Sequence, residues 1–395
     1  MSSLNQIPRR IILGPGPSSA HPRVLKALSS PVMGYLDPDY FSIIEEVESL
    51  LKDTFKTSQR AFAIAGSGSA GMEAGFSSLV EEGDKILICE NGYFCERMIL
   101  MAKRLKLDVL TINVKWGTPV DPAQVEEILK QHNDIKMVSA IHAETSTGVM
   151  NPIKEISNIA HQNGSLFMVD CVTSLAGSEL RFDDWDIDYA YSGSQKCLAS
   201  PPGLSPIAIS NRALSIIEKR KTLPSSWYLD LSLIADYWGT NHKAHHTAPV
   251  NMIYGLRESL KLVFEEGLET RWKRHHKLAS ALKEGLKAMG LNLPIDPQVA
   301  LDQLTVIDIP HGINDEQFRL KLLRKYLIEI GRGLGQFKGK VWRVGLMGES
   351  CIPANVFALL QAFEQLLSED GFELNKGDSL ATASRVLSES SPLPY

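Results

Sequence analysis

The stretch Tyr191-Ser192-Gly193-Ser194-Gln195-Lys196 continues an apolar run over residues 187–191 and ends a turn of small residues on a lysine. A second apolar run, Phe167-Met168-Val169-Asp170, ends on an aspartate. Short apolar runs bounded by turn residues are typical of buried strands in a parallel sheet. Because the carboxyl ends of parallel strands meet at one edge, Lys196 and Asp170 are predicted to face one crevice.

The chain before this stretch alternates between expected strands and expected helices, which predicts an α/β fold with a mostly parallel central sheet covered on both faces. Strands are expected at 61–65, 85–89, 109–114, 135–142 and 165–170, with helices at 72–80, 95–105, 122–131 and 152–162.

The domain organisation follows from length and composition, because 395 residues are long for a single core. Residues 1–21 are predicted to form an N-terminal arm, and residues 22–268 the large domain. After a long helical region that starts near residue 245 and runs with little interruption to 289, residues 269–370 are expected to form a smaller α+β domain. Residues 371–395 are serine-rich and lack periodicity, which predicts a disordered tail.

Composition and charge narrow the classes of protein to consider. A net charge of -5 and a pI near 6.1 give no electrostatic reason to expect nucleic acid or a membrane surface as a partner. Five cysteines without paired spacing indicate neither a disulfide framework nor a zinc site. The adjacent His245-His246 pair lacks an evident third ligand, so no metal is expected. Without a signal-like or membrane-spanning apolar run, we expect a cytoplasmic protein.

A lysine and an aspartate at one crevice match the needs of one cofactor, pyridoxal phosphate. Its aldehyde condenses with a lysine, and its ring nitrogen requires an acidic partner. The alternatives are a solvated surface charge for Lys196 and a helix cap or salt bridge for Asp170. Val172, two residues beyond Asp170, would point to the same side and could pack on the ring.

Further residues fit this hypothesis less specifically. The turn Gly66-Ser67-Gly68-Ser69-Ala70-Gly71 precedes a helix and could cradle a phosphate with backbone amides, although it lacks the ending of a P-loop. Phe94 could stack on the ring or belong to the core. Arg343 is a lone charge in an apolar strand, so either an internal carboxylate or a substrate carboxylate is expected to pair with it.

Together these motifs resemble class V pyridoxal-phosphate aminotransferases of the alanine–glyoxylate and serine–pyruvate type, over roughly residues 10–370. The matching segments are Leu13-Gly14-Pro15-Gly16-Pro17-Ser18, Ser67-Gly68-Ser69 with Met72-Glu73-Ala74, Ala143-Glu144-Thr145-Ser146-Thr147-Gly148, Val169-Asp170, Ser192-Gly193-Ser194-Gln195-Lys196, Tyr237-Trp238-Gly239, His245-His246-Thr247 and the segment from Gly339 to Gly348.

The resemblance implies fold type I of the pyridoxal-phosphate enzymes and a role for each matching residue. Lys196 would be the Schiff-base lysine, and Arg343 would bind the substrate carboxylate. The residues implied to contact the cofactor are Asp170 at the ring nitrogen, Val172 under the ring, Phe94 stacked on it, Thr145 at the phenolic oxygen, and Ser67, Gly68, Ser69 and Gln195 at the phosphate.

The resemblance also implies a homodimer, because relatives embrace the partner with the N-terminal segment. The residues before and at His245-His246-Thr247 would reach the neighbour's phosphate, with Thr247 among the cofactor contacts. Relatives commonly have tyrosine where this chain has Ala244. Ala244 has no hydroxyl group to donate to the phosphate, so this contact is lost unless Lys243 supplies it instead. We therefore expect weaker cofactor retention.

The implied reaction is transfer of an amino group from a small amino acid such as alanine or serine to glyoxylate or pyruvate. S-ureidoglycine–glyoxylate transamination in purine breakdown is an alternative, with Tyr35 as a candidate substrate-binding residue. A non-catalytic subunit of the same fold would be favoured by loss of Lys196 or Asp170, and both are present. Desulfurases of this fold generally have histidine before the lysine, where this chain has Gln195.

Overall fold

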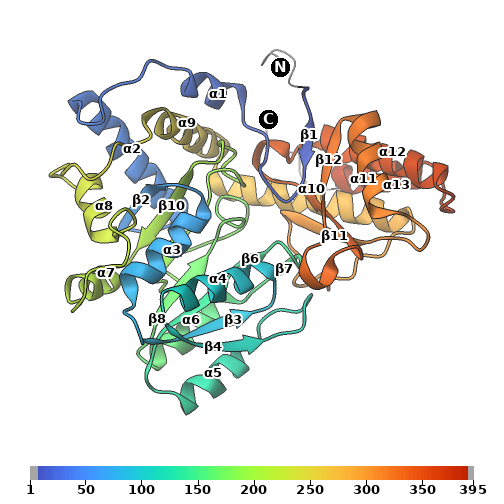
Figure 1. The fold of residues 1–395 in the computed structure, drawn as a ribbon. Coiled ribbons are helices and arrows are strands. Elements are labelled where there is room, and N and C mark those ends of the chain that lie inside the picture. Colours follow the sequence, from blue (N-terminus) through green and yellow to red (C-terminus); the bar gives the residue numbers. More distant parts are fainter. Residues whose placement is uncertain (1–7, 390–395) are drawn as a thin grey trace.

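The larger sheet of the computed structural model, which describes residues 8–389, has seven strands in the order β2-β10-β9-β8-β5-β3-β4 (Figure 1). These are β2 (Arg60–Ala65), β3 (Lys85–Glu90), β4 (Asp108–Asn113), β5 (Ile135–Ile141), β8 (Leu166–Asp170), β9 (Tyr189–Tyr191) and β10 (Leu204–Ile209). Neighbouring strands are parallel except at β10, which runs antiparallel to both β2 and β9. Every residue of β8 and β10 is buried, so both faces of the sheet are covered, as predicted.

The helices around this sheet begin where the sequence supplies caps. Asp37 and Asp121 accept backbone N–H groups at the starts of α2 and α5, and each is followed by a proline at the first helical position. The helices of this part are α1 (Pro22–Leu28), α2 (Pro38–Phe55), α3 (Gly68–Leu79), α4 (Tyr93–Arg104), α5 (Pro122–Gln131), α6 (Ile153–Gln162), α7 (Asn211–Glu218), α8 (Leu231–Trp238) and α9 (Val250–Glu266).

A second, four-stranded sheet has the order β1-β12-β13-β11 and carries its own core. At the centre of this core, Trp342 stacks on Phe318 with ring centroids 4.2 Å apart, and Phe363 meets both rings edge-on. Its elements are β1 (Ile11–Leu13), α10 (Leu268–Ala288), β11 (Leu304–Asp308), α11 (Asp315–Tyr326), β12 (Ile328–Arg332), β13 (Val341–Gly345), α12 (Pro353–Glu369) and α13 (Asp378–Glu389), with short 3-10 turns at Gly335–Phe337 and Gly348–Ser350. A small hairpin, β6 (Ala143–Glu144) with β7 (Val149–Met150), follows β5 and precedes α6 in the chain.

The long helical region is two helices rather than one. Gly267 ends α9 and precedes α10 with a φ of 86°, a conformation that glycine adopts without steric cost. The core of the large sheet extends to Leu268 at the start of α10, and the core of the small sheet takes up Leu278 farther along the same helix. Helix α10 therefore belongs to both units.

One expectation about the C-terminal end of the chain was wrong. Residues 378–389 form α13 rather than a disordered tail, because Ala383 and Ser379 are buried and Leu380 and Leu387 pack against the small core. The serine-rich composition concealed this apolar helical face; residues 390–395 lie outside the described part. Within the predicted arm, β1 pairs in parallel with β12 of the same chain and lies as a blue strand beside the orange and red elements (Figure 1). Residues 1–7 also lie outside the described part.

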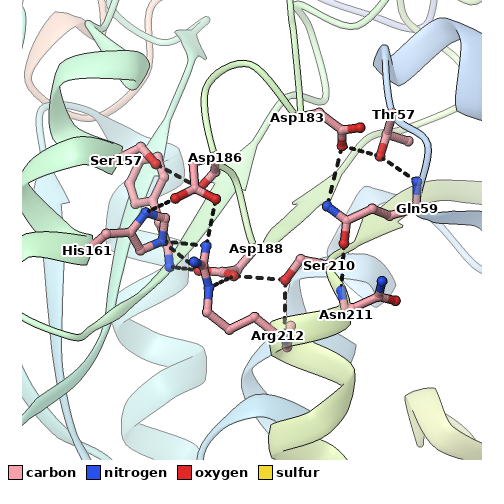
Figure 2. A network of polar contacts seen from close by, with 12 residues as sticks. Thr57, Gln59, Ser157, His161, Asp183, Asp186, Asp188, Ser210, Asn211 and Arg212 are labelled. Carbon is pink, nitrogen blue, oxygen red and sulfur yellow. Dashed lines mark hydrogen bonds and ion pairs between the residues drawn. The ribbon is translucent and has the colours of Figure 1, made fainter.

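A polar network joins the amino ends of β8 and β9, at the edge opposite to the predicted crevice (Figure 2). The buried carboxylate of Asp188 accepts hydrogen bonds from Arg212 Nε at 2.6 Å, from Ser210 Oγ at 2.8 Å and from the backbone N–H of Phe167 at 2.9 Å, and it lies 2.9 Å from His161 Nε2. Burial alone would raise the pKa of Asp188, but His161, Arg212 and the backbone N–H lower it below its ordinary value.

Across residues 8–389, no helix combines the length and the apolar character that crossing a bilayer requires.

Candidate active site

One cavity lies at the carboxyl ends of the strands of the large sheet, where α3 and α4 begin. The register pairs Asp170 at the end of β8 with Ile141 of β5 and with Tyr191 of β9, so that these strand ends are level. Predicted site residues that line the cavity are Ser67, Gly68, Ser69, Phe94, Thr145, Asp170, Val172, Gln195 and Lys196. These nine residues therefore meet at one cavity, while Tyr35, Thr247 and Arg343 do not line it, and the chemical roles of all of them stay predictions.

Lys196 lies in the loop that joins β9 to β10, and its side chain is buried, with 9% of the residue exposed. Burial, followed by the charge of Arg343, lowers the pKa of Lys196 to about 8, while Asp170 acts in the opposite direction. Its Nζ donates a hydrogen bond to the carbonyl of Pro15. A buried amine with this pKa is partly neutral near physiological pH and can act as a nucleophile or a base.

The turn Gly14-Pro15-Gly16-Pro17-Ser18 packs directly on the lysine. Gly16 has a φ of 114°, and a Cβ atom there would lie 2.4 Å from the Nζ of Lys196. Ser18 holds the following backbone, because its N–H donates to the carbonyl of Gln195 at 2.8 Å and its Oγ donates to the carbonyl of Lys196 at 2.7 Å. The sequence predicted a turn in this segment, but only the tertiary structure places it over Lys196.

Asp170 is buried at the end of β8, and two donors hold its carboxylate. The N–H of Val172 donates to Oδ1 and the hydroxyl of Tyr191 to Oδ2, each at 2.8 Å. Burial raises the pKa of Asp170 to about 6 despite these bonds and the nearby Lys196 cation. The carboxylate is thus a strong acceptor for a proton held by a group in the cavity.

An anion-binding corner is formed by residues 67–69 together with Gln195. Ser67 is the N-cap of α3 without a side-chain cap bond, so the first amides of this helix lack that partner. A Cβ atom on Gly68 would lie 2.7 Å from Val172 Cγ2, so only glycine fits this approach. The Oε1 of Gln195 is buried and without a hydrogen-bond partner among the described residues. The N–H groups at the start of α3 suit a phosphate group, to which the side-chain NH2 of Gln195 could also donate a hydrogen bond.

The start of α4 brings a cation to the same cavity. The guanidinium of Arg97 lies 5.0 Å from the centroid of the Phe94 ring, and its Nη1 lies 3.3 Å from Ser69 Oγ. Sequence reasoning missed Arg97, although its position one helical turn after Phe94 was a usable signal.

Glu144 was also not assigned a role, and it fixes the backbone around the cavity. Its buried carboxylate accepts the N–H groups of Ser146 at 2.8 Å and of Phe94 at 3.2 Å. Burial raises the pKa of Glu144 to about 6. The acid therefore holds the residue predicted to stack on the ring.

Arg343 lies in β13 of the small unit and is buried, but it is not among the residues lining the cavity. Its Nε donates to the carbonyl of Arg332 at 2.8 Å, and its Nη1 donates to the carbonyl of Thr145 at 3.1 Å. Burial lowers the pKa of Arg343 to about 10, which leaves the guanidinium charged at neutral pH. Within residues 8–389 it has no ion pair, so the internal carboxylate considered from the sequence is not found there.

Tyr35 and Thr247 lie outside the cavity of their own chain. The ring of Tyr35 is tilted against Tyr237 at 6.5 Å, and its carbonyl accepts the Tyr237 hydroxyl at 2.8 Å. Thr247 is exposed on the loop before α9, as is Ala244. In the described part of the chain, no cluster of three or more His, Cys, Asp or Glu side chains is arranged to hold a metal ion.

The residues present fit pyridoxal phosphate. The buried, partly neutral amine of Lys196 suits its aldehyde, the Asp170 carboxylate suits a protonated ring nitrogen, and the anion-binding corner suits its phosphate. The uncapped N–H groups at the start of α3 and the narrow approach at Gly68 are the structural observations that support this match.

Comparisons with known proteins place this geometry in context. The family model for aminotransferase class-V matches residues 36–337. A crystal structure of ureidoglycine-glyoxylate aminotransferase from Bacillus subtilis superposes with a TM-score of 0.94 at 39% identity, covering 96% of this chain and 98% of that one. An alanine–glyoxylate aminotransferase structure from Nostoc sp. gives a TM-score of 0.91 at 41% identity, covering 93% and 97%. The alanine–glyoxylate aminotransferase of Rattus norvegicus is 36% identical over 91% of this chain and 88% of its own length.

Proposed function

The chain belongs to the class-V aminotransferase family, and we propose that it moves an amino group from a small amino acid to glyoxylate or pyruvate with pyridoxal phosphate as cofactor. The observation that carries this proposal is the placement of Lys196 and Asp170 at one cavity beside the anion-binding corner. We take glyoxylate as the preferred acceptor, because the names of the ureidoglycine–glyoxylate transaminase and of the alanine–glyoxylate aminotransferase both include it.

The cofactor would be held at three ends by this chain. Lys196 would hold its carbonyl carbon, Asp170 its ring nitrogen, and the amides of Gly68 and Ser69 with Gln195 its phosphate. When bound, pyridoxal phosphate supplies a carbonyl that takes up the amino group and a ring that accepts the electron pair released at the substrate Cα. Phe94 and Val172 would pack on the ring.

Lys196 is the proposed base. Once its amine is free of the cofactor, the Nζ of Lys196 takes the proton from the substrate Cα. The pKa of about 8 leaves a useful fraction of the amine neutral near physiological pH. Asp170, as a carboxylate, holds the proton on the ring nitrogen, which keeps the ring electron-accepting.

Arg343 is the proposed anchor for the substrate carboxylate. Its guanidinium is charged, buried and without an ion pair in the described part of the chain, while Thr145 and Arg332 carbonyls fix its orientation. A carboxylate can accept two parallel hydrogen bonds from such a group. Amino acids and 2-oxo acids share this carboxylate, so one anchor would serve both half-reactions.

S-ureidoglycine is the second candidate donor. It is favoured by the Bacillus subtilis relative, which is 38% identical over 95% of both chains. Alanine and serine remain the first candidates, and the Nostoc and rat relatives, both named alanine–glyoxylate aminotransferase, support alanine.

We further propose that the enzyme is a homodimer in which the segment around Thr247 reaches the partner's anion-binding corner. Thr247 and Ala244 are exposed in the single chain, so they are available for such a contact. Ala244→Tyr is then expected to retain pyridoxal phosphate more tightly during dialysis than the wild type. Equal retention would contradict the idea that a hydroxyl group is missing there.

The test begins with the purified protein. We expect visible absorbance that borohydride abolishes, with the reduced cofactor attached to the peptide that contains Lys196. Lys196→Ala should lose this attachment, whereas Lys154→Ala, an exposed change on α6, should keep it. Alanine, serine and S-ureidoglycine are then compared as donors with glyoxylate and with pyruvate. A colourless protein that cannot be reconstituted with pyridoxal phosphate would refute the proposal.

A further inference from the structure

The backbone around Lys196 is held by donors from three separate segments. Successive carbonyls of residues 195–198 accept hydrogen bonds: the first two from Ser18, the carbonyl of Cys197 from Arg271 Nη2 at 2.7 Å, and that of Leu198 from Ser259 Oγ. Among these donors, Arg271 carries the only charge, and it is buried with 6% of the residue exposed.

Arg271 belongs to a group of side chains at the junction of α9 and α10, called here the α10 polar cluster: the buried Arg271 and His275 and the partly buried Glu266 and Arg274. Glu266 accepts from Arg271 Nη1 at 2.6 Å and from Arg274 Nε at 2.6 Å. Burial alone would raise the pKa of Glu266, but the two guanidiniums lower it below its ordinary value. The helix break at Gly267 separates Glu266 from α10 and allows its carboxylate to face both arginines.

The same cluster holds the small unit. Arg274 Nη1 donates to the carbonyl of Gly348 at 3.2 Å and to that of Cys351. The N–H of Gly348 donates to His275 Nε2 at 3.0 Å, and burial lowers the pKa of His275 well below its ordinary value, so the ring is a neutral acceptor. Gly348 follows β13, the strand that carries Arg343, and a Cβ on it would lie 2.9 Å from the Cys197 carbonyl.

We propose that Arg271 is a positioning residue for Lys196, and that the α10 polar cluster sets the lysine loop against the segment after β13. This inference rests on the proposed function, in which Lys196 binds the cofactor. Arg271 contacts the carbonyl directly after Lys196, whereas Arg274 contacts Gly348 and Cys351, and Glu266 joins the two arginines. The amine of Lys196 and the guanidinium of Arg343 are thereby held in a fixed mutual arrangement.

The charges of the cluster allow the positioning role of Arg271 to be tested without unfolding the protein. Two arginines face one glutamate, so removing Arg271 leaves Glu266 and Arg274 as a matched pair. Arg271→Met is therefore expected to fold while it releases the Cys197 carbonyl. Arg271→Lys keeps a charged donor that can reach this carbonyl.

The experiment measures how fast added pyridoxal phosphate becomes fixable to the Lys196 peptide by borohydride in protein freed of cofactor. Loss of one charge-assisted hydrogen bond predicts about tenfold slower attachment in Arg271→Met, and no more than about threefold slower attachment in Arg271→Lys. The matched control is Arg212→Met, because Arg212 pairs with buried Asp188 at 2.6 Å on the far edge of the same sheet (Figure 2). It should lower the urea midpoint but leave the attachment rate unchanged.

Wild-type attachment in folded Arg271→Met overturns the inference, as does equal slowing in Arg212→Met. If Arg271→Met does not fold, Arg271→Gln replaces it, and an unchanged rate there has the same meaning. A wild-type protein that takes up no pyridoxal phosphate at Lys196 contradicts the proposed function itself, which is a different result.

Discussion

Replacing Asp170 by asparagine is expected to stabilise the protein without cofactor and to remove most of its activity. The carboxylate is buried at the end of β8, and its two hydrogen bonds do not offset the loss of hydration, since burial raises its pKa to about 6. Asparagine has nearly the same shape. Its carbonyl can accept the Val172 N–H, and its amide can donate to the Tyr191 oxygen.

The size of the effect follows from the shift in pKa. The folded pKa of about 6 exceeds the ordinary value of 3.8 by about two units. At ~1.4 kcal/mol per unit, ionised Asp170 costs the folded state about 3 kcal/mol at neutral pH. Because the folded pKa is raised, this cost is absent below pH 3.8, grows as the pH rises toward 6, and is constant above it.

Urea unfolding of cofactor-free protein at pH 5 and at pH 7.5 measures the difference. Asp170→Asn should unfold at higher urea than the wild type at pH 7.5, with a smaller gain at pH 5. Amino transfer by the reconstituted variant should fall on the order of 10²-fold or more, because the ring nitrogen loses its ionic partner.

Asp188 provides the control with the opposite sign. Its carboxylate is equally buried, but its partners lower its pKa below the ordinary value (Figure 2). A carboxylate whose pKa is lower in the folded state than in the unfolded state stabilises the fold at pH values above its unfolded-state pKa. This stability is lost as the pH falls through the folded-state pKa. Asp188→Asn should therefore destabilise the protein at pH 7.5, by roughly 2 kcal/mol. The reasoning is refuted if Asp170→Asn destabilises the protein as Asp188→Asn does.

Three further predictions concern other parts of the chain. Gly68→Ala should weaken pyridoxal phosphate binding about tenfold in a spectroscopic titration, because its Cβ would lie 2.7 Å from Val172 Cγ2, whereas Gly34→Ala, at an open position, should not. The rate of cofactor attachment to Lys196 should rise with pH and level off near its pKa of about 8; a rate still rising at pH 10 would contradict the burial argument. Ending the chain after Gly377 removes α13 and should lower the free energy of unfolding on the order of 3 kcal/mol in urea; an unchanged free energy would contradict the packing of α13 on the small core.

Asp170 and Asp188 illustrate two uses of a buried carboxylate on neighbouring strands. Asp188 is paired with cations and supports the amino edge of the sheet. Within residues 8–389 Asp170 forms no ion pair, although Lys196 lies near, and its unfavourable ionisation leaves it ready to bind a protonated ring. Stability given up at a functional residue in this way is common in enzymes.

The sequence by itself determined the strand-and-helix alternation, the edge at which Asp170 and Lys196 meet, and the family to which the chain belongs. These features depend on local information, because a strand that ends on a polar residue delivers it to the sheet edge regardless of distant contacts. The proposed phosphate-binding turn at residues 66–71 could be predicted for the same reason, because the first N–H groups of a helix are free of hydrogen bonds within that helix wherever it lies in the fold.

Only the tertiary structure decided which distant segments support the site. The turn at Pro15 and Gly16 covers Lys196, Arg271 holds the carbonyl of Cys197, and α13 packs on α10 although the sequence between them gives no sign of it. Each of these contacts joins residues far apart in the chain, and no local pattern records such a pairing. The same residues on another fold would have different partners, so their roles were decided by packing.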